Sequence, residues 1–381
     1  MSLHTLMFGW EYPPKNEGGL GVACRGLVRG LVQNGTAVTL ILPSPASSDH
    51  DLLSIRSPHD IGTDELLQIR TVASNLQPYE GTEEFAARMA RQAGATGAQH
   101  DLYGPDLGEA VAQFTAMSVA LTKDVEPDVI HCHDWMTYEA GRIAAKHHRV
   151  PLVAHIHATE LDRTDFQPNT WIADRERQGL LAADKVIAVS RYTKDMLTKY
   201  YGIPAGKIAV VHNGHDMERI QPGAVKKTIA KGPLVLFLGR LTVQKNPFQF
   251  LEVARVIHSA RPDAHFVMAG DGPLLGQLME RSCALGLEDN VLFTGRASQR
   301  EVNMLYSQAS CFVMPSLSEP FGLVALEAIA HGVPVVLSKQ SGASEVVDHG
   351  FKVDFWDTEK MADCIVTILR EEPLAMQLSA E

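Results

Sequence analysis

The chain has 381 residues, of which 45% are hydrophobic and 21% charged, so it is long enough for two hydrophobic cores and its composition excludes a disordered protein. Thirty-four lysines and arginines against 45 aspartates and glutamates give a net charge of -11, which disfavours nucleic acid as a partner because the phosphate backbone carries the same sign. The first residues lack the basic and long apolar segments of a signal peptide, and no apolar run approaches the ~18 residues of a membrane span. We therefore expect a cytoplasmic protein that does not span a membrane.

Short apolar, β-branched runs alternate with helical stretches along the chain, a pattern typical of parallel sheets built from βαβ units. A first set of predicted strands covers residues 3–10, 37–43, 128–134, 151–158, 185–190 and 207–214. A second set covers residues 233–240, 265–272, 291–297, 311–316 and 333–338. The pattern thus starts over, which predicts two doubly wound α/β domains.

Between the two sets, residues 217–232 carry Pro, Gly and a small lysine cluster without periodicity, as interdomain linkers do. We place the boundary near Pro222, which gives an N-terminal domain of residues 1–222 and a C-terminal domain of residues 223–381. Residues 45–110 have weak periodicity and are expected to form loops and helices that decorate the first sheet. When two doubly wound sheets face each other, the carboxyl ends of their strands line one cleft, so ligand-binding residues are expected at strand ends.

The five cysteines are widely scattered and show no Cys-x-x-Cys spacing, which indicates reduced core residues rather than disulfides or metal ligands. They are Cys24, Cys132, Cys283, Cys311 and Cys364.

Two cations follow the first strand of the second set. Arg240 ends this strand and Lys245 comes directly before Asn246 and Pro247, which suit the N-cap and the first residue of a helix. Cationic side chains and free backbone N–H groups both stabilise oxygen anions, so the combination suits a diphosphate. The alternative is an exposed loop with unrelated charges.

One carboxylate, Glu327, stands in an otherwise apolar segment that predicts a largely buried helix from Gly322 to His331, stopped by Gly332. Because burying a carboxylate without a partner is costly, Glu327 must find a partner or reach a cleft. A ribose diol would satisfy both of its oxygens. A salt bridge to an arginine of the same domain is the alternative.

The loop before this helix carries a second carboxylate, Glu319. The amides of Phe321, Gly322 and Leu323 at the start of the helix are free to meet an anion. We expect Glu319 and these amides to meet a bound sugar and its phosphate.

A glycine-rich loop ends in Gly18, Gly19 and Gly21 after the first strand, and such a loop lets backbone amides approach an anion closely. It is a poor match to a dinucleotide fingerprint, because Cys24 stands where the third glycine belongs and a long loop precedes Gly18.

Histidines stand at alternate positions of two strand ends, so each pair projects from one face of its strand. The pairs are His131 with His133 and His155 with His157. Four imidazoles suggest zinc, but no thiolate or supporting pattern accompanies them, and strand-end histidines often form hydrogen bonds in a cleft. We therefore predict no metal site here.

A nucleotide transferase that depends on Mg²⁺ needs an acidic metal motif, and the sequence has one Asp-x-Asp, formed by Asp49 and Asp51. It lies in a serine-rich loop and is interpreted as a solvated turn.

Several motifs, in this order, resemble the retaining glycosyltransferases of family 4, which have the GT-B fold of two Rossmann-like domains facing across a cleft, and their glycogen and starch synthase relatives. They are GGLG at 18–21, HDW at 133–135, HIHATE at 155–160, VHNG at 211–214, GRL at 239–241 with Lys245, GDGP at 270–273 and EPFGLVALEA at 319–328. The resemblance spans residues 1 to about 370. Relatives usually continue through another helical segment that crosses back to the N-terminal domain.

The resemblance implies that Arg240 and Lys245 hold the donor diphosphate and that Glu327 binds the nucleotide ribose. Glu319 would contact the sugar and phosphates together with four amides, those of Phe321, Gly322, Leu323 and Val324.

It also implies that Gly18 and Gly19 close over the diphosphate, and that His157 contacts the transferred sugar near the reacting centre. Arg296 matches a base-contacting position. His133 and Asp134 lie at the cleft in this pattern.

By the same resemblance, a hexose moves from ADP- or UDP-glucose to a carbohydrate acceptor with retention of configuration. The donor is a substrate, so no cofactor is expected, and the two cations replace a metal ion. WEYPPKNEGGLG and ATELDRT resemble the glucan-synthase branch most, which favours an α-1,4-glucan acceptor. Two alternatives are a sugar-nucleotide 2-epimerase and a non-catalytic sugar-nucleotide or glycan-binding module.

Overall fold

The structure of the chain is a computed structural model that describes residues 3–13, 18–46, 50–57, 107–214 and 231–379. Its contacts divide the chain into two compact units, residues 1–156 with 175–187 and residues 157–174 with 188–381. The predicted boundary near Pro222 lies outside the described residues and stays a prediction, as do the linker around it and the Asp-x-Asp turn at Asp49.

The first sheet has seven strands in the order β3-β2-β1-β4-β5-β6-β7. The strands are β1 (His4–Phe8), β2 (Ala37–Ile41), β3 (Leu53–Arg56), β4 (Val129–His133), β5 (Leu152–Ile156), β6 (Lys185–Ala188) and β7 (Ile208–Val210). β1 pairs in parallel with β2 on one side and β4 on the other. The strand order therefore reverses between β1 and β4, the position where doubly wound sheets open a crevice for ligands.

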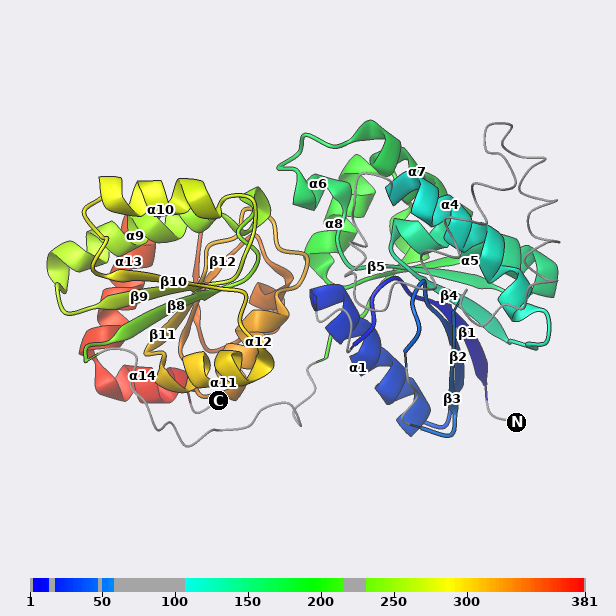
Figure 1. Cartoon of the computed structure of the whole chain (residues 1–381), viewed down its shortest axis with the longest axis horizontal. Coiled ribbons are helices and arrows are strands. Elements are labelled where there is room, and N and C mark those ends of the chain that lie inside the picture. The colour runs from blue at the N-terminus through cyan, green and yellow to red at the C-terminus, as the bar shows by residue number, and fades with distance from the viewer. Residues whose placement is uncertain (1–2, 14–17, 47–49, 58–106, 215–230, 380–381) are drawn as a thin grey trace, which may run out of the picture. The chain divides into compact units, whose positions relative to one another are not determined.

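Helices cover both faces of this sheet (Figure 1). Met7 of β1 packs with Cys24 and Val28 of α1 on one face, whereas Cys132 of β4 lies so close to Gly141 of α5 that a Cβ there would be 1.9 Å from its Sγ. Burial on both faces explains why these strands read as continuous apolar runs. The helices between β1 and β8 in the sequence are α1 (Gly19–Gln33), α4 (Leu107–Ser118), α5 (Trp135–His148), α6 (Glu160–Arg163), α7 (Thr170–Ala182) and α8 (Arg191–Tyr200), with short 3-10 turns η2 (Ala120–Thr122) and η3 (Ala205–Lys207).

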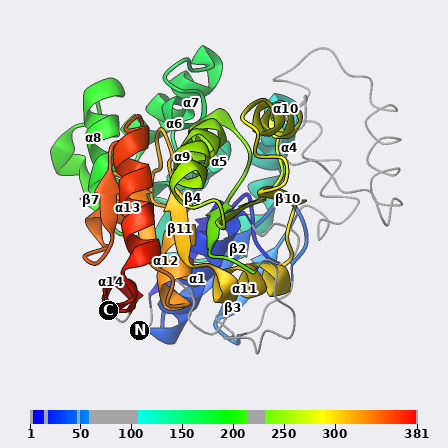
Figure 2. The ribbon, with the colours of Figure 1, turned by 90° about the vertical axis from the view of Figure 1, so that its left-hand side faces the viewer.

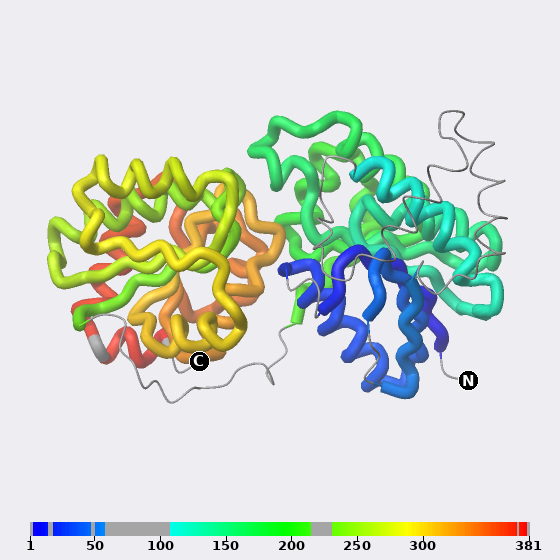
Figure 3. The backbone as a smooth tube through the Cα atoms, viewed as in Figure 1, coloured from blue at the N-terminus to red at the C-terminus, as the bar shows by residue number. Residues whose placement is uncertain are grey.

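The second sheet has six strands in the order β10-β9-β8-β11-β12-β13. They are β8 (Leu234–Leu238), β9 (His265–Ala269), β10 (Val291–Gly295), β11 (Cys311–Met314), β12 (Val335–Ser338) and β13 (Phe351–Val353). Figure 3 shows the path of the chain, from β8 outward to β10 and then back through β11 to β13. The reversal point of this sheet lies between β8 and β11.

Helices α9, α10 and α13 cover one face of the second sheet and α11 and α12 the other (Figures 1 and 2). Phe237 packs with Phe250 and Ile365 on the first face, and Leu236 packs with Leu305 on the second. The elements of this half are α9 (Pro247–Ala260), α10 (Leu275–Ala284), α11 (Gln299–Gln308), α12 (Leu323–Ala330), α13 (Thr358–Arg370), α14 (Glu372–Ser379), η5 (Val243–Lys245) and η6 (Gly342–Glu345). In the part of the chain that the structure describes, no helix has both the length and the apolar character needed to cross a bilayer.

The predicted strands of both sets are all present, each shorter than predicted. Two strands were missed, β3 and β13. β3 has four residues and an exposed Ser54, and β13 has three residues, so neither is long enough to show an alternation. The prediction for residues 45–110 is wrong at β3, because this segment extends the sheet instead of decorating it.

Both predicted helix boundaries of the second sheet are confirmed. α9 begins at Pro247 with Asn246 at the N-cap. α12 ends at Ala330. The positive φ of 73° at Gly332 and the hydrogen bond from its N–H to the Ile329 carbonyl at 2.8 Å are those of a C-terminal glycine stop.

All five cysteines are unpaired, as predicted, and four of them are buried: Cys24, Cys132, Cys311 and Cys364. The prediction of a core position is wrong for Cys283, which is exposed on α10. The buried side of that helix is formed by Leu278 and Ser282 instead.

Candidate active site

An ion pair lies at the reversal point of the second sheet. Lys245 ends η5, which follows β8, and its Nζ pairs with the Glu319 carboxylate, which follows β11. The side chains are 19% and 7% exposed. The hydroxyl of Ser316 donates to the same carboxylate oxygen at 3.3 Å. The sequence analysis assigned both charged residues to one site, and the structure brings them together. The sequence did not indicate that Lys245 and Glu319 pair with each other.

The backbone on both sides of Glu319 is fixed by the loop after β12. Its N–H donates to the Gln340 carbonyl at 2.9 Å, and its carbonyl accepts from the Gly342 N–H at 2.9 Å. A Cβ on Gly342 would lie 2.2 Å from the Pro320 carbonyl oxygen, so this approach requires glycine. The carboxylate therefore projects from a rigid support.

Arg240 is exposed and directly follows Gly239, in the loop after β8. Gly239 has a φ of 155°, and its Cβ position lies 3.9 Å from the stem of Lys245. The two predicted phosphate-binding cations thus come from adjoining parts of one loop, with Lys245 partly buried and Arg240 open to solvent.

The loops that carry Arg240 and Arg296 are linked through Gly270. A Cβ on Gly270 would lie 1.9 Å from the Gly239 carbonyl oxygen, and the Gly270 N–H donates to the Gly295 carbonyl at 2.9 Å. Arg296 follows Gly295 and is exposed. The predicted diphosphate and base contacts therefore lie at one edge of the sheet, on loops whose backbones touch a common glycine.

The N-terminus of α12 lies next to the ion pair in sequence and supplies further donors. Gly322 is its N-cap with a φ of 99°, and a Cβ there would lie 2.9 Å from Met314 Cε, so glycine is required. Phe321 is buried. The amides of Leu323 and Val324 belong to the first turn, where backbone N–H groups lack helical partners and the helix dipole favours an anion.

Glu327, in the same helix, is half-buried. Its Oε2 lies 3.4 Å from the hydroxyl of Tyr306, which donates to the Val324 carbonyl at 2.8 Å. Burial and the nearby Glu327 charge raise the pKa of Tyr306 well above its usual value. Tyr306 is a contact that neither interpretation of the sequence anticipated, because no local pattern joins α11 to α12.

A cluster of polar groups forms hydrogen bonds with Ser318, the residue before Glu319. The hydroxyl of Ser318 donates to Asp162 of α6 and lies 2.7 Å from the hydroxyl of Tyr192. Gln244 Nε2 donates to the Ser318 carbonyl at 3.1 Å. Burial raises the pKa of Asp162 and raises the pKa of Tyr192 to about 12. The ATELDRT segment contains Asp162, but sequence reasoning gave that residue no role.

Glu345 of η6 attaches the start of α8. Its carboxylate accepts from the amides of Arg191 at 2.9 Å and Tyr192 at 2.7 Å, and His212 Nε2 lies 3.0 Å from it. A carboxylate at a helix N-terminus is favoured by the unpaired amides and the helix dipole. This attachment fixes the segment that carries Tyr192.

In the first unit, Gly18 is the N-cap of α1 and Gly19 its first residue. Glu11 already lies at this helix end. Its Oε2 accepts from the Gly21 N–H at 3.3 Å and would be 2.8 Å from a Cβ on Gly18. The predicted closure of the two glycines over a diphosphate stays a prediction.

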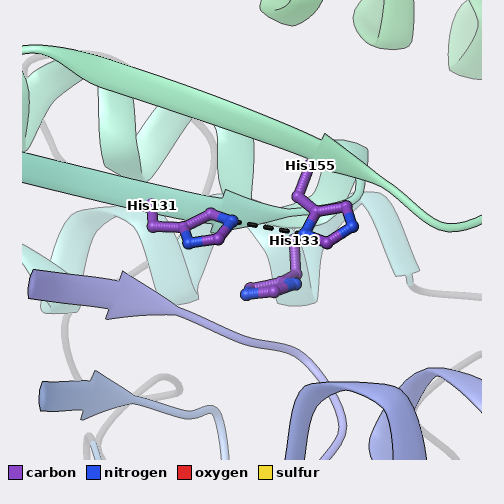
Figure 4. Close-up of side chains that lie close together, drawn as sticks. All are labelled: His131, His133 and His155. Atoms are coloured by element: carbon purple, nitrogen blue, oxygen red, sulfur yellow. Dashed lines mark hydrogen bonds between the residues drawn. The ribbon is translucent and has the colours of Figure 1, made fainter. Parts of the chain in front are cut away.

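Three of the four strand-end histidines lie together in the first unit, and Figure 4 shows His131 and His155 directed at each other with His133 beside them. Burial lowers the pKa of His131 to about 4. The fourth, His157, follows β5 and belongs to the second unit, where it is 9% exposed. The three imidazoles whose nitrogens lie within 4.8 Å of one another do not include His157.

Asp134, predicted at the cleft, follows this cluster and is buried. It is the N-cap of α5 with a φ of 60°, an uncommon conformation for a residue other than glycine. Its N–H donates to the His155 carbonyl at 2.9 Å. Such local strain persists where the surrounding structure enforces it, often at functional sites.

Family profiles match both halves of the chain. One described as Glycosyltransferase Family 4 matches residues 17–219, and one described as Glycosyl transferases group 1 matches residues 224–381. Together with two doubly wound sheets and a cationic strand-end site, they define a glycosyltransferase of the GT-B class. The chain belongs to glycosyltransferase family 4. The resemblance drawn from the sequence motifs is confirmed.

Two curated relatives match most of the chain. An uncharacterized glycosyltransferase of Methanocaldococcus jannaschii is 30% identical over 362 residues, which cover 91% of this chain and 83% of the relative. A glycogen synthase of Mycobacterium tuberculosis is 28% identical over 361 residues, which cover 91% and 81%.

Similar solved structures support the GT-B fold. Sucrose-phosphate synthase from Thermosynechococcus elongatus superposes with a TM-score of 0.72 at 21% identity and covers 100% of this chain and 92% of that one. The catalytic domain of starch synthase IV from Arabidopsis thaliana, bound to ADP and acarbose, gives a TM-score of 0.67 at 15% identity and covers 100% of both chains.

Proposed function

We propose that this protein is a retaining hexosyltransferase that moves glucose from a nucleoside diphosphate sugar to an α-1,4-glucan in the cytoplasm. The observation that carries the proposal is the ion pair between Lys245 and Glu319 at the reversal point between β8 and β11. Arg240 and the N-terminus of α12 lie on the adjoining loops. This arrangement combines cations and amides for a diphosphate with a carboxylate for sugar hydroxyls.

The catalytic step follows from these groups. The bond between the anomeric carbon and the diphosphate oxygen breaks, the acceptor oxygen bonds to the same face of that carbon, and the acceptor proton passes to an oxygen of the leaving diphosphate. Negative charge grows on the diphosphate, so Lys245 and Arg240 bind the transition state more strongly than the ground state. No metal ion and no cofactor enters this step.

Because Lys245 is paired with Glu319, the donor must break this ion pair when it binds. An arriving diphosphate competes with Glu319 for the ammonium group, and the carboxylate is then available to accept hydrogen bonds from the sugar hydroxyls. Because both side chains are largely shielded from water, the exchange replaces one desolvated charge interaction by another instead of exposing either charge.

The remaining roles are carried over from the family pattern. Glu327 binds the ribose diol, Arg296 contacts the base, and His157 contacts the transferred sugar. Gly18 and Gly19 close over the diphosphate. Glu327 projects from a helix anchored by the hydroxyl of Tyr306, which suits a carboxylate that must keep a fixed direction.

A curated relative and a solved structure of the same fold support a glucan acceptor and a nucleoside diphosphate donor. The relative is a glycogen synthase, and the starch synthase structure of the same fold holds ADP and acarbose. The donor is therefore ADP- or UDP-glucose in this proposal.

The test begins with a thermal-shift screen of nucleoside diphosphate sugars in the presence of EDTA, since a ligand that binds only the folded state raises the melting temperature. Hits are then incubated with and without glycogen, and the products are followed by proton NMR. Nucleotide release that requires glycogen and produces new α-linked glucose signals supports the proposal. A rearranged donor without acceptor would identify an epimerase, and binding without turnover a binding module.

A further inference from the structure

Three buried imidazoles lie on one face of the first sheet. His133 of β4 is directly opposite His155 of β5 in the strand register, and His131 stands two positions before His133 on the same face. His131 is also paired with Met7 of β1, so the three rings share the face covered by α1. They are 7%, 0% and 3% exposed for His131, His133 and His155.

The three rings lie close together, and His131 is stacked on both His133 and His155. The centroids lie 4.6 Å apart for His131 and His133, 5.4 Å for His131 and His155, and 5.1 Å for His133 and His155. Three imidazoles bound to one tetrahedral ion, with metal–nitrogen bonds of about 2.0–2.1 Å, have their ring centroids about 5 Å apart. The strand register alone therefore sets the spacing of a three-histidine site.

The nitrogen positions agree with this geometry. His131 Nε2 lies 3.3 Å from His155 Nδ1, the spacing of about 3.3 Å that two ligands of a tetrahedral zinc ion adopt. In this structure the same two nitrogens form a hydrogen bond, which a bound ion would replace. One nitrogen from each of the three rings lies within 4.8 Å of the others.

We propose that His131, His133 and His155 form a binding site for one divalent transition metal ion of the zinc class. A donor set of imidazole nitrogens suits Zn²⁺, Co²⁺, Ni²⁺ or Cu²⁺, whereas Mg²⁺ and Ca²⁺ require oxygen ligands. Three protein ligands leave a fourth tetrahedral position for water or another donor. The ion links β4 to β5 beside Asp134.

This site departs from the sequence-based expectation of histidines that only form hydrogen bonds. The expectation rested on two pairs from two strands, whereas the structure selects three histidines and excludes His157. The ion takes no part in the proposed transfer step. Its effect is on the stability of the first sheet, because an ion that binds the folded state stabilises it by mass action.

The experiment uses the full chain, purified without a metal-affinity column, treated with EDTA and then titrated with Co²⁺. We expect one Co²⁺ per chain and the intense visible bands of a four-coordinate ion, displaced by Zn²⁺. Zn²⁺ should raise the melting temperature and Mg²⁺ should not. These readouts do not depend on glycosyl transfer, so they can fail while the proposed function stands.

Variants identify the ligands. His155→Gln and His133→Gln should each weaken Zn²⁺ binding by about tenfold or more, since loss even of groups that only orient a metal ligand costs about 10- to 100-fold. The matched control is His147→Gln, which changes an exposed histidine of α5 whose ring lies 4.8 Å from that of half-buried His148, and it should bind as the wild type does.

The proposal is overturned if the wild-type chain binds no stoichiometric Co²⁺, or binds it with the weak bands of a six-coordinate ion. It is also overturned if binding is lost in His147→Gln but kept in His155→Gln. The wild-type titration needs no variant, so it decides the matter even if His133→Gln and His155→Gln fail to fold.

Discussion

Lys245 and Glu319 form a shielded ion pair where the strand order of the second sheet reverses. If this pair handles the donor, Lys245→Met and Glu319→Gln should each lower kcat by about 10²- to 10³-fold, as removal of one transition-state contact does in other enzymes. The double variant should lose less than the product of the two single losses, because both changes affect the same interaction. Initial rates of nucleotide release with glycogen measure all three.

The control for this pair is Lys352→Met, which removes an exposed lysine from β13 of the same sheet and should leave the rate unchanged. Rates near the wild-type value in both Lys245→Met and Glu319→Gln would rule out the assigned role.

Glu327 should recognise the ribose of the donor. A hydrogen bond to a charged group contributes about 1.5–3 kcal/mol, so Glu327→Gln should raise KM for the nucleotide sugar by about 10- to 150-fold. A donor with 2′-deoxyribose should remove most of the difference between the two proteins, because the contact is then missing in both.

Tyr306→Phe serves as the control for Glu327, since it keeps the carboxylate and removes the hydroxyl that donates to the Val324 carbonyl. It should lower the melting temperature and preserve discrimination against the deoxyribose donor. If Glu327→Gln discriminates as strongly as the wild type, the carboxylate binds something other than the ribose.

Gly270 should tolerate no side chain. Its φ of 145° and a Cβ position 1.9 Å from the Gly239 carbonyl oxygen predict that Gly270→Ala destabilises the protein by about 1–3 kcal/mol or more. Since Gly239 precedes Arg240, nucleotide binding should weaken as well. Urea unfolding and nucleotide titration measure the two effects.

Gly276→Ala is the matched control, because its Cβ would meet nothing within 4 Å and it lies in α10, where alanine is favoured by about 1 kcal/mol. A Gly270→Ala variant as stable as Gly276→Ala would show that the loops adjust without cost.

The raised pKa of Asp162 makes stability depend on pH. Burial favours the protonated carboxyl, so its contribution is fully present below the ordinary value of 3.8 and is lost as the pH rises through the higher pKa of the folded state. Relative to Asp162→Asn, the wild type should therefore lose stability as the pH is raised from about 4. Urea unfolding of both proteins across this range gives the free energy of unfolding of the wild type relative to Asp162→Asn. A relative value that stays constant or rises with pH would contradict the assignment.

The repeated apolar runs were sufficient to predict the two sheets, because strands buried on both faces must be apolar throughout. β3 and β13 were not predicted because each is short and carries a polar residue. Pairing with a neighbouring strand, and not an apolar run, makes each of them a strand. Lys245 and Glu319 could be assigned to one site because each follows a predicted strand, and parallel strands of one sheet end at a common edge.

The supporting contacts were beyond the sequence. Ser318 and Asp162 are 156 positions apart, and no local pattern records such a pairing. The contact between Tyr306 and Glu327 and the grouping of His155 with His131 and His133 also depend on how helices and strands pack, so the sequence did not predict them. Most of the segment expected to form loops and helices, residues 58–106 of 45–110, lies outside the described residues.

Glu345 binds three donors with two oxygens, two of them neighbouring amides of α8. Any opening that releases the Arg191 amide must also withdraw the acceptor of Tyr192. Their protons should therefore exchange with deuterium in a single concerted event, and the start of α8 detaches as a unit instead of fraying residue by residue.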